Sequence, residues 1–397
     1  MTFREAEDHL LGLELFGMRF GLERMHHLMS ALGMPQRRFA SIHVVGSNGK
    51  SSTVRFIAAI LERHGLHTGS YTSPHLASFR ERIEVGEQAV SEERFAAAVE
   101  RTVGLVEDIT QFEAVTAAAY HELAARDVEV AVIEAGLGGR YDATNVIPSK
   151  VVVLTGVGLE HTRWLGPTIT DIAQEKLAVV NDHSKLVIPS DLHPDALAVA
   201  RTVAAERHAQ LITGPVSDGS FQRRNFTLAY VAAGEFLERP PEPAAVESAV
   251  RETRIPGRLD VVGEEPLVIH DGAHNPAGTE ALAAALPEVL GDRRPAVVVA
   301  SVLDDKDAAG MLAALLPLFD HTVFTRCANP RALSPGTLES LAAKLGGPRS
   351  ETVAEPHAAV ERAREIAGPK GAVVATGSIY LVADLVRGEG RTRASSL

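Results

Sequence analysis

A glycine-rich turn between an apolar strand and a helix is the feature that most strongly constrains the fold of this chain. The β-branched run at residues 42–45 predicts a buried strand, and the apolar periodicity of residues 54–61 predicts a helix. Between them stand Gly46, Ser47, Asn48, Gly49, Lys50, Ser51 and Ser52. Backbone N–H groups at the start of such a helix point at an anion, and the helix dipole favours its binding. We therefore predict a phosphate-binding loop in which Lys50 neutralises nucleotide phosphates and a serine hydroxyl reaches Mg²⁺.

The spacing of this loop is shorter than in the common phosphate-binding pattern. Only Ser47 and Asn48 separate Gly46 from Gly49. An ordinary strand–turn–helix unit with an exposed lysine is therefore the alternative interpretation. The strand before the turn and the helix after it favour the phosphate site.

The composition bounds the class of protein. With 397 residues, 45% of them hydrophobic and 23% charged, the chain is long enough for two globular domains. Its net charge of −12 argues against nonspecific nucleic-acid binding. Anionic ligands must therefore be held by individual lysines, arginines and helix N-termini.

The cysteine count and the lengths of the apolar runs indicate in which cellular compartment the protein works. The one cysteine, Cys327, excludes an internal disulfide and a cysteine-rich metal site. No apolar run has the length that a bilayer-spanning helix needs, and residues 1–9 are polar and acidic, unlike a signal peptide. We expect a cytoplasmic protein that does not bind membranes.

Short apolar runs alternate with helical patterns along most of the chain, which predicts an α/β fold with a mostly parallel sheet. The expected strands are residues 43–45, 128–133, 151–154 and 186–188, and the expected helices are 56–61, 95–106 and 115–123. Ligands should collect at the carboxyl ends of these strands.

The turn at residues 255–258 is the expected boundary between two domains, 1–256 and 257–397. The proline- and glutamate-rich residues 235–247 are expected to be a surface excursion between helices. The second domain has candidate strands at 267–270, 296–300, 321–325 and 372–376, and residues 388–397 are expected to be frayed.

Three polar residues in the first domain are candidates for metal or phosphate chemistry. Glu134 ends a hydrophobic strand, where a carboxylate suits Mg²⁺. His161 follows the strand at 151–154 and is able to bind a metal or move a proton, but the pattern alone leaves this open. For Lys176, on a helical stretch, a solvated surface lysine is the simpler interpretation from the residues alone.

A polar turn in the second domain is a further candidate site. His270, Asp271, His274 and Asn275 close a strand, and Pro276 starts a helix. Arg258, on the linker before this strand, is placed to reach back to a nucleotide.

Taken together, these segments resemble the folylpolyglutamate synthase/dihydrofolate synthase family, within the Mur-type amide ligases. The loop at 46–52 matches the family's Gly-Thr-Asn-Gly-Lys-Gly-Ser, which accounts for the short spacing. Further matching segments are residues 20–24, 72–76, 111–113, 134–145, 158–162, 172–176, 256–258, 271–276, 305–307 and 376–380. They cover nearly the whole chain, to Val382.

The resemblance implies a P-loop-type Mur ligase central domain followed by a smaller Rossmann-like α/β domain. It also implies ATP-dependent ligation of L-glutamate to a folate or dihydropteroate carboxylate through an acyl phosphate. Partners would be ATP, L-glutamate and the folate substrate, in a monomer.

The resemblance assigns roles to particular positions. ATP contacts would be residues 46–52 with Asn225, Arg258, Asp271 and His274. Two Mg²⁺ sites would use Ser51, Ser73, Glu134 and His161, with Lys176 carbamylated as an anionic oxygen ligand and Lys50, Lys176 and His161 in catalysis. The pterin-side pocket would use Gln111, Phe112, Glu113, Tyr141, Asp142 and Ala143.

Two positions depart from the family pattern. Ser51 stands where glycine is usual and Tyr141 where leucine or phenylalanine is common. Because of Ser51, the loop has a second serine that could bind Mg²⁺. Because of Tyr141, the contacts in the pterin-side pocket can differ from those of the family.

Two alternative functions remain at this point. One is a Mur-type ligase that acts on a cell-wall precursor, with the same ATP site and a different acceptor pocket. The other is a nucleotide-dependent switch without ligation, which needs no Lys176-type residue and no amino-acid site.

Overall fold

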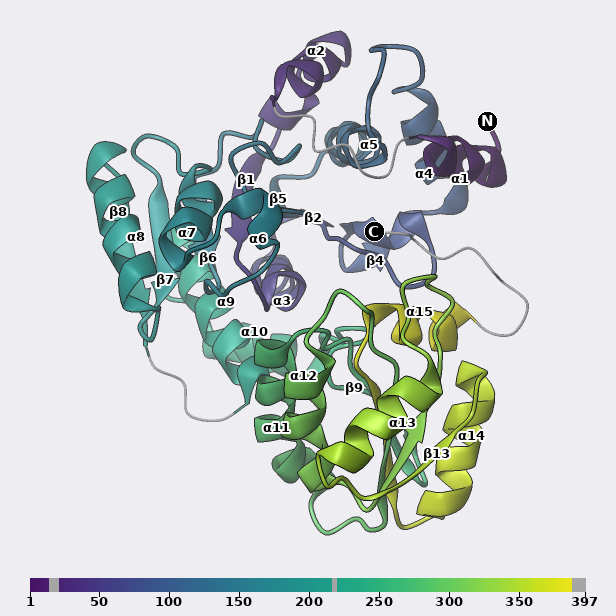
Figure 1. The fold of residues 1–397 in the computed structure, drawn as a ribbon. Coiled ribbons are helices and arrows are strands. Elements are labelled where there is room, and N and C mark those ends of the chain that lie inside the picture. The colour runs from purple at the N-terminus through teal and green to yellow at the C-terminus, as the bar shows by residue number, and fades with distance from the viewer. Residues whose placement is uncertain (14–20, 216–219, 388–397) are drawn as a thin grey trace.

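The computed structural model describes residues 1–13, 21–215 and 220–387, and these form two α/β halves (Figure 1). In Figure 1 the N-terminal half runs from purple to teal and the C-terminal half from green to yellow. Phe20 and residues 388–397, for which the sequence predicted a family match and a frayed end, lie outside the described residues.

The first sheet has eight strands within the described residues, in the order β4-β3-β2-β5-β1-β6-β7-β8. The strands from β2 to β8 in that order pair in parallel, and β3 and β4 add an antiparallel edge. Their bounds are β1 Ala40–Val45, β2 Thr68–Tyr71, β3 Ile83–Val85, β4 Gln88–Ala89, β5 Val130–Glu134, β6 Val151–Leu154, β7 Lys185–Pro189 and β8 Gln210–Gly214.

Helices cover both faces of this sheet. They are α1 Phe3–Gly12, α2 Glu23–Ala31, α3 Lys50–Glu62, α4 Glu92–Glu100, α5 Gln111–Ala125, α6 Thr162–Leu165, α7 Ile169–Leu177, α8 Pro194–Glu206, α9 Phe221–Leu237 and α10 Pro243–Glu252, with 3₁₀ turns η1 Pro35–Arg37 and η2 Phe79–Arg82. The residues of each strand alternate between the faces: on β5, Val130 and Val132 face α3 and α9, while Ala131 and Ile133 face the other cluster.

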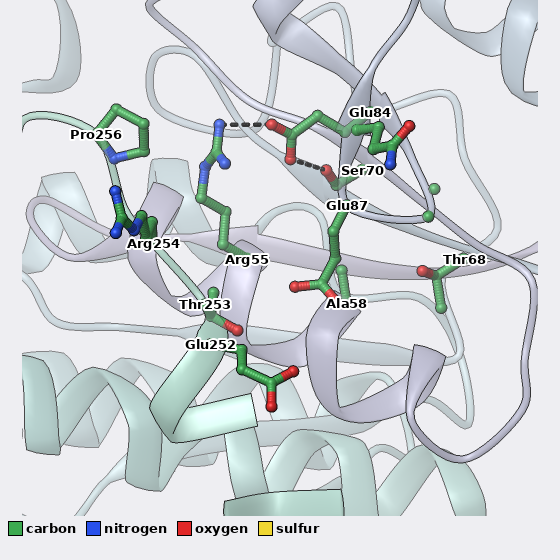
Figure 2. Close-up of a pocket in the computed structure, with 13 residues that line it drawn as sticks. Arg55, Ala58, Thr68, Ser70, Glu84, Glu87, Glu252, Thr253, Arg254 and Pro256 are labelled. Atoms are coloured by element: carbon green, nitrogen blue, oxygen red, sulfur yellow. Dashed lines mark hydrogen bonds and ion pairs between the residues drawn. The ribbon is translucent and has the colours of Figure 1, made fainter. Parts of the chain in front are cut away.

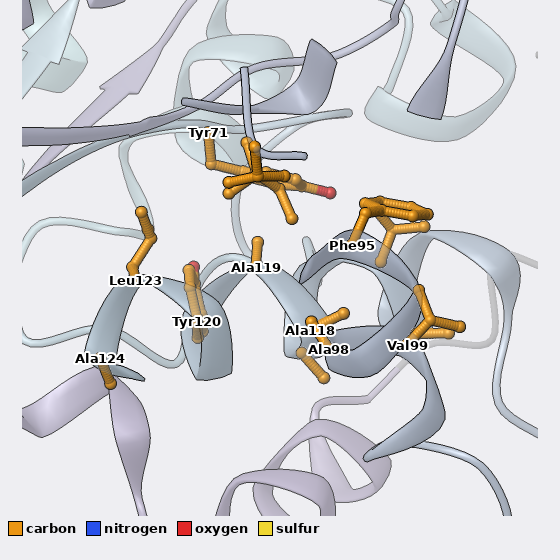
Figure 3. Close-up of a cluster of buried hydrophobic side chains, with 14 of the residues drawn as sticks. Tyr71, Phe95, Ala98, Val99, Ala118, Ala119, Tyr120, Leu123 and Ala124 are labelled. Carbon is orange, nitrogen blue, oxygen red and sulfur yellow. The ribbon is translucent and has the colours of Figure 1, made fainter. Parts of the chain in front are cut away.

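That other cluster contains the largest fully buried aromatic side chains within the described residues. Tyr71, Phe95 and Tyr120 meet the alanine-rich faces of α4 and α5 (Figure 3). The small alanine side chains on α4 and α5 leave room for these aromatic rings, which pack between the two helices and β2. This packing holds the end of β2, from which the loop containing Ser73 begins.

The second sheet has the order β13-β12-β11-β14-β10-β9 and is parallel except for the β9–β10 pair. Its strands are β9 Asp260–Glu264, β10 Leu267–His270, β11 Ala296–Ala300, β12 His321–Phe324, β13 Arg349–Thr352 and β14 Ala372–Thr376. Its helices are α11 Pro276–Leu290, α12 Ala308–Leu315, α13 Pro335–Lys344, α14 Pro356–Ala367 and α15 Ile379–Arg387, with η3 Leu316–Leu318.

The predicted mixed α/β class with mostly parallel sheets is confirmed. Several expected element boundaries differ from the observed ones, among them the following three. The helix predicted to reach Val106 ends at Glu100, since the following turn breaks its periodicity. The segment at 235–247 is only partly an excursion, because α9 continues to Leu237 and α10 begins at Pro243. The strand predicted at 128–133 is shifted to Val130–Glu134.

Candidate functional site

The phosphate-loop turn is held in a conformation that requires its glycines. Gly46 has φ +147° and Gly49 has φ +84°, where it caps α3. A Cβ atom on Gly46 would collide with Thr155, and one on Gly49 with Asn225. The turn is therefore packed between the end of β6 and α9, so both positions need glycine.

The loop after β6 supports the turn with several hydrogen bonds. The Thr155 hydroxyl donates to the Asn48 carbonyl at 2.6 Å, and the Ser47 N–H donates to the Gly156 carbonyl at 3.0 Å. The Ser47 hydroxyl also accepts from the Gly158 N–H at 2.9 Å. These contacts aim the start of α3, with its free N–H groups, at one side of the sheet.

Two lysines converge on this turn from different helices. Lys50 Nζ and Lys176 Nζ donate to the Gly46 carbonyl at 2.9 and 3.0 Å. Lys176, on α7, is only 2% exposed and pairs with Glu160 at 2.6 Å. Burial lowers the pKa of Lys176, with Glu160 opposing this effect. Lys176 is thus no solvated helix lysine, contrary to the simpler sequence interpretation.

Glu160 is the counter-ion of Lys176, and no role was predicted for it from the sequence. Burial would raise its pKa, but the charges of Lys176 and Lys50 lower it to about 2. The carboxylate therefore stays ionised beside the turn. Its position next to His161 in the matched segment 158–162 was the available sequence signal.

Glu134 joins the phosphate loop to the loop after β2. Its Oε1 accepts from the Ser51 hydroxyl at 2.9 Å, and its Oε2 accepts from the Ser73 N–H at 3.1 Å. Burial raises the pKa of this carboxyl, and the charge of Lys50 opposes the shift. Three of the four predicted metal ligands, Ser51, Ser73 and Glu134, therefore lie together.

His161, the fourth predicted ligand, is the N-cap residue before α6 and has a left-handed conformation with φ 44°. Burial lowers the pKa of its imidazole, and the charges of Glu160, Lys306, Lys176 and Lys50 also act on it. Within the described ranges, no group of three or more His, Cys, Asp or Glu side chains is arranged to hold a metal.

The linker and the second half approach the same turn. The Asn275 amide donates to the Asn48 side chain at 3.3 Å, a contact between the two halves that was not predicted from the sequence. Buried Asp271 accepts from the N–H groups of Leu259 and Ala273, both at 2.8 Å, and so fixes the linker.

Arg258 links the charges of the two halves. Its charge acts on Glu134, Asp271 and His274. Burial raises the pKa of Asp271 and lowers that of His274 to about 4, so His274 is neutral near pH 7. The start of α3 is thus surrounded by the phosphate loop, Asn225, Arg258 and Asp271.

The predicted pterin-side residues are placed in two neighbouring segments. Phe112 packs on Gly136 and near Tyr71, with ring centroids 6.2 Å apart. Asp142 is buried and accepts from the Leu137 N–H at 2.8 Å, next to buried Ala143. Tyr141 is 42% exposed.

The polar groups of Gln111 and Glu113 are used within the fold. Gln111 donates to the Leu10 carbonyl at 2.9 Å, and Glu113 pairs with Arg24 at 2.9 Å while it caps α5. These contacts tie α1 and α2 to the start of α5.

A cavity of about 370 Å³ lies elsewhere, between α3, the β3–β4 hairpin and the linker (Figure 2). Its walls carry the pair Arg55–Glu84, 2.7 Å apart, and Ser70, which donates to Glu84. None of the predicted site residues lines it.

Comparisons with known proteins assign the family. The Mur ligase middle domain matches residues 44–230, and the Mur ligase glutamate ligase domain matches residues 257–379. The dihydrofolate synthase/folylpolyglutamate synthase of Bacillus subtilis is 32% identical, over 97% of this chain and 98% of that protein. The chain belongs to the folylpolyglutamate synthase/dihydrofolate synthase family.

Solved structures of family members share the whole architecture. Mycobacterium tuberculosis folylpolyglutamate synthase complexed with ADP and AMPPCP has a TM-score of 0.90, with 31% identity and 99% of each chain covered. Escherichia coli FolC in complex with DHPP and ADP has a TM-score of 0.85, with 28% identity and 97% of each chain covered. The chain spans only half the length of a probable bifunctional folylpolyglutamate synthase/dihydropteroate synthase of Haloferax volcanii, which is 34% identical over 97% of this chain.

No helix within the described parts of this family member is both long and apolar enough to cross a bilayer.

Proposed function

We propose that this protein uses ATP to join L-glutamate to the carboxylate of dihydropteroate or of a folate. The observation that carries the proposal is the convergence of Lys50, Lys176 and Glu134 on one glycine-rich turn, in a chain of this family. The names of the curated relatives and the ADP-containing structures support it.

The chemistry requires activation of a poor electrophile. Transfer of the γ-phosphoryl group to the acceptor carboxylate gives an acyl phosphate, and the amine of glutamate then displaces phosphate to form the amide. Lys50 and the N–H groups at the start of α3 stabilise the charge on the transferring phosphoryl oxygens. Arg258 and His274 meet the nucleotide from the linker and the second half, with Asn225 beside the turn.

Mg²⁺ fits the donor set at Glu134, although only one carboxylate is present there. Mg²⁺ commonly binds through one or two carboxylates, substrate phosphates and retained water molecules. Ser51, Ser73 and Glu134 would hold one ion, and His161 with a carbamylated Lys176 would hold a second. The ion would supply Lewis-acid stabilisation of the phosphoryl oxygens.

The proposal also covers the domain division, the acceptor pocket, the oligomeric state and the location. The domains are 1–256 and 257–397, and the pterin side of the acceptor lies along Gln111–Glu113 and Tyr141–Ala143. The protein works as a monomer, since one chain carries every proposed site residue. A cytoplasmic location fits an ATP substrate and a single thiol.

Product analysis tests the function. Purified protein is incubated with ATP, Mg²⁺, L-glutamate and either dihydropteroate or tetrahydrofolate. The masses of the products are then measured by mass spectrometry. We expect phosphate release that depends on both glutamate and the acceptor, with a product heavier by one glutamyl residue. Phosphate release that needs neither would favour a nucleotide switch, and activity only with a cell-wall precursor would favour the other ligase class.

A further inference from the structure

A buried histidine on the strand that leads to the phosphate loop takes part in none of the roles described so far. His43 lies within β1, shortly before Gly46, and is fully buried. Its neighbours Ile42 and Val44 pack in the apolar cluster of α3 and α9, so His43 faces the opposite side of the sheet. A polar side chain in the middle of a sheet is costly to bury unless its hydrogen bonds compensate for the lost water.

The imidazole of His43 reaches the loop that follows β5. Its Nε2 lies 2.9 Å from the hydroxyl of Thr144, whereas its Nδ1 has no hydrogen-bond partner. We call residues 136–145 the acceptor loop, because they carry the proposed pterin-side residues Tyr141, Asp142 and Ala143. A core histidine that leaves one nitrogen unpartnered needs an explanation, and its contact with this loop offers one.

The direction of the hydrogen bonds follows from the groups that Asp142 accepts. Its Oδ1 accepts from the hydroxyl of Thr144 and from the N–H of the same residue at 3.0 Å. A hydroxyl has a single hydrogen, so Thr144 must accept from His43. Burial lowers the pKa of His43 to about 3, so the imidazole is neutral and its one N–H is at Nε2. Donation therefore runs from His43 through Thr144 to Asp142.

The acceptor loop is folded around the Asp142 carboxylate. Leu137 precedes Asp142 and Thr144 follows it, and both donate to it, which closes the loop on itself. Burial raises the pKa of Asp142, and the hydrogen bond from the Thr144 hydroxyl is the strongest effect that opposes this rise. The Tyr120 hydroxyl of α5 donates to the Thr144 carbonyl at 3.0 Å. Thr144 is thus held from β1 on one side and from α5 on the other.

We propose that His43 is a positioning residue for the acceptor pocket, an inference that rests on the proposed function. Its hydrogen bond fixes the direction of the Thr144 hydroxyl, which keeps Asp142 and the adjacent Tyr141 and Ala143 in the arrangement that receives the pterin side of the acceptor. Because β1 continues directly into the phosphate loop, one strand sets the geometry of both the acceptor pocket and the nucleotide site.

The competing interpretation is that His43 only fills space in the sheet. The two roles make different demands on the side chains. Packing requires volume and shape at this position, whereas the hydrogen-bond chain requires a donor at residue 43 and a hydroxyl group at residue 144. Pairs of variants that keep the volume and either keep or remove the hydrogen bond therefore separate the two roles.

Steady-state kinetics on such pairs tests the positioning role. His43→Leu and Thr144→Val remove the donor and the hydroxyl. We expect each to raise the KM for dihydropteroate and for tetrahydrofolate about tenfold, since both acceptors carry the pterin group, and to leave the KM for ATP unchanged. His43→Gln, whose amide is able to donate, and Thr144→Ser should restore most of the acceptor affinity. Thr102→Val is the matched control, because its buried hydroxyl donates to the Val99 carbonyl at 2.7 Å, outside the acceptor loop.

The double variant tests whether His43 and Thr144 act as one chain. Either single change already breaks the chain, so His43→Leu combined with Thr144→Val should raise the acceptor KM no more than the larger single change does. Additive effects would mean that the two residues act separately, which would overturn the inference.

Thermal unfolding adds a readout that does not depend on turnover. Dihydropteroate should raise the Tm of the unaltered protein, of His43→Gln and of Thr144→Ser more than that of His43→Leu and Thr144→Val, whereas ADP should raise all of them equally. If His43→Leu fails to fold, Thr144→Val, which lies outside the sheet, decides alone. An unchanged acceptor KM, or an equal rise of the acceptor and ATP KM values, overturns the inference while the unaltered protein still ligates. An unaltered protein that ligates neither acceptor would instead overturn the proposed function.

Discussion

At the residue scale, Lys50 provides the most direct test of the phosphate loop. Its ammonium donates to the carbonyl groups of Gly46 and Ser47, within the loop itself, so its removal leaves the packing of β1 and α3 in place. We expect Lys50→Ala to lower the rate of amide formation by about 10²–10³-fold, the usual effect of losing one transition-state donor. Phosphate-release rates and circular dichroism measure the two effects. Near-normal turnover in a folded variant would contradict the phosphate-loop assignment.

Glu134 is the residue that tests the Mg²⁺ proposal. In Glu134→Gln the amide oxygen is still able to accept a hydrogen bond from Ser51 or Ser73, but the negative charge is gone. We expect the Mg²⁺ concentration for half-maximal activity to rise at least tenfold, with a smaller change in the acceptor KM. A superimposable Mg²⁺ titration would exclude Glu134 as a ligand.

Lys176 is the residue whose chemical state the proposal changes. Carbamylation needs a neutral amine, and burial lowers the pKa of Lys176, so the carbamate should form more readily as pH rises. Labelled bicarbonate should give a carbamate signal by ¹³C NMR that Lys176→Ala lacks. The variant should be inactive and partly restored by short-chain carboxylates. An active Lys176→Ala without such a signal would return Lys176 to a structural ion pair with Glu160.

Sequence patterns identified some of these residues and not others, for physical reasons. Glu134 ends an apolar strand next to glycines, which is a local signal. Lys176 shows no periodicity that separates a buried lysine from an exposed one, because its burial depends on Gly46 and Glu160, which are distant in sequence.

At the element scale, β1 carries a buried histidine that makes stability depend on pH. His43 Nε2 lies 2.9 Å from the Thr144 hydroxyl, which donates to Asp142. Burial lowers the pKa of His43 from 6.5 to about 3. Between these values the unfolded chain binds a proton that the folded chain does not, so stability falls as pH falls through this window.

His43→Gln should reduce this pH dependence. We expect the slope of unfolding free energy against pH, measured by urea unfolding between pH 6 and pH 4, to decrease by on the order of 1 kcal/mol per pH unit. His26→Gln, on an exposed position of α2, is the matched control. An unchanged slope in His43→Gln would mean that His43 is protonated in the folded protein.

The elements themselves were predicted best where they are buried on both faces. The expected strand at 151–154, and those at 267–270, 296–300 and 372–376, match the structure because parallel strands carry continuous apolar runs. The end of α4 was missed because residues 101–106 remain partly apolar, although they include Gly104 and form a turn in which the Thr102 hydroxyl donates to the Val99 carbonyl.

At the scale of the whole molecule, the two halves meet over the phosphate loop in a way that no local pattern encodes. The turn at 255–258 indicates where the second α/β series begins but not how that series faces the first. The contacts of Asn275 with Asn48 and of Leu76 with Val382 depend on that placement. Closure of the halves should keep water from the acyl phosphate, which water would otherwise hydrolyse.

Arg258 tests this role of closure. We expect Arg258→Ala to slow ligation and to raise the amount of ATP hydrolysed per amide formed, because a weaker seam admits water. Arg254→Ala, an exposed position on the same linker, should leave the ratio unchanged. An unaltered ratio and ATP affinity in Arg258→Ala would make Arg258 a linker residue only.

The central claim is that the acceptor carboxylate is converted to an acyl phosphate. The most direct test follows the transfer of a carboxylate oxygen to the released phosphate. Dihydropteroate labelled with oxygen-18 in its carboxylate is incubated with the protein, ATP, Mg²⁺ and L-glutamate, and the released phosphate is analysed by mass spectrometry. If the acceptor carboxylate is phosphorylated before glutamate attacks, one labelled oxygen should appear in each phosphate released. Amide formation with unlabelled phosphate would contradict an acyl-phosphate route at the Lys50 loop.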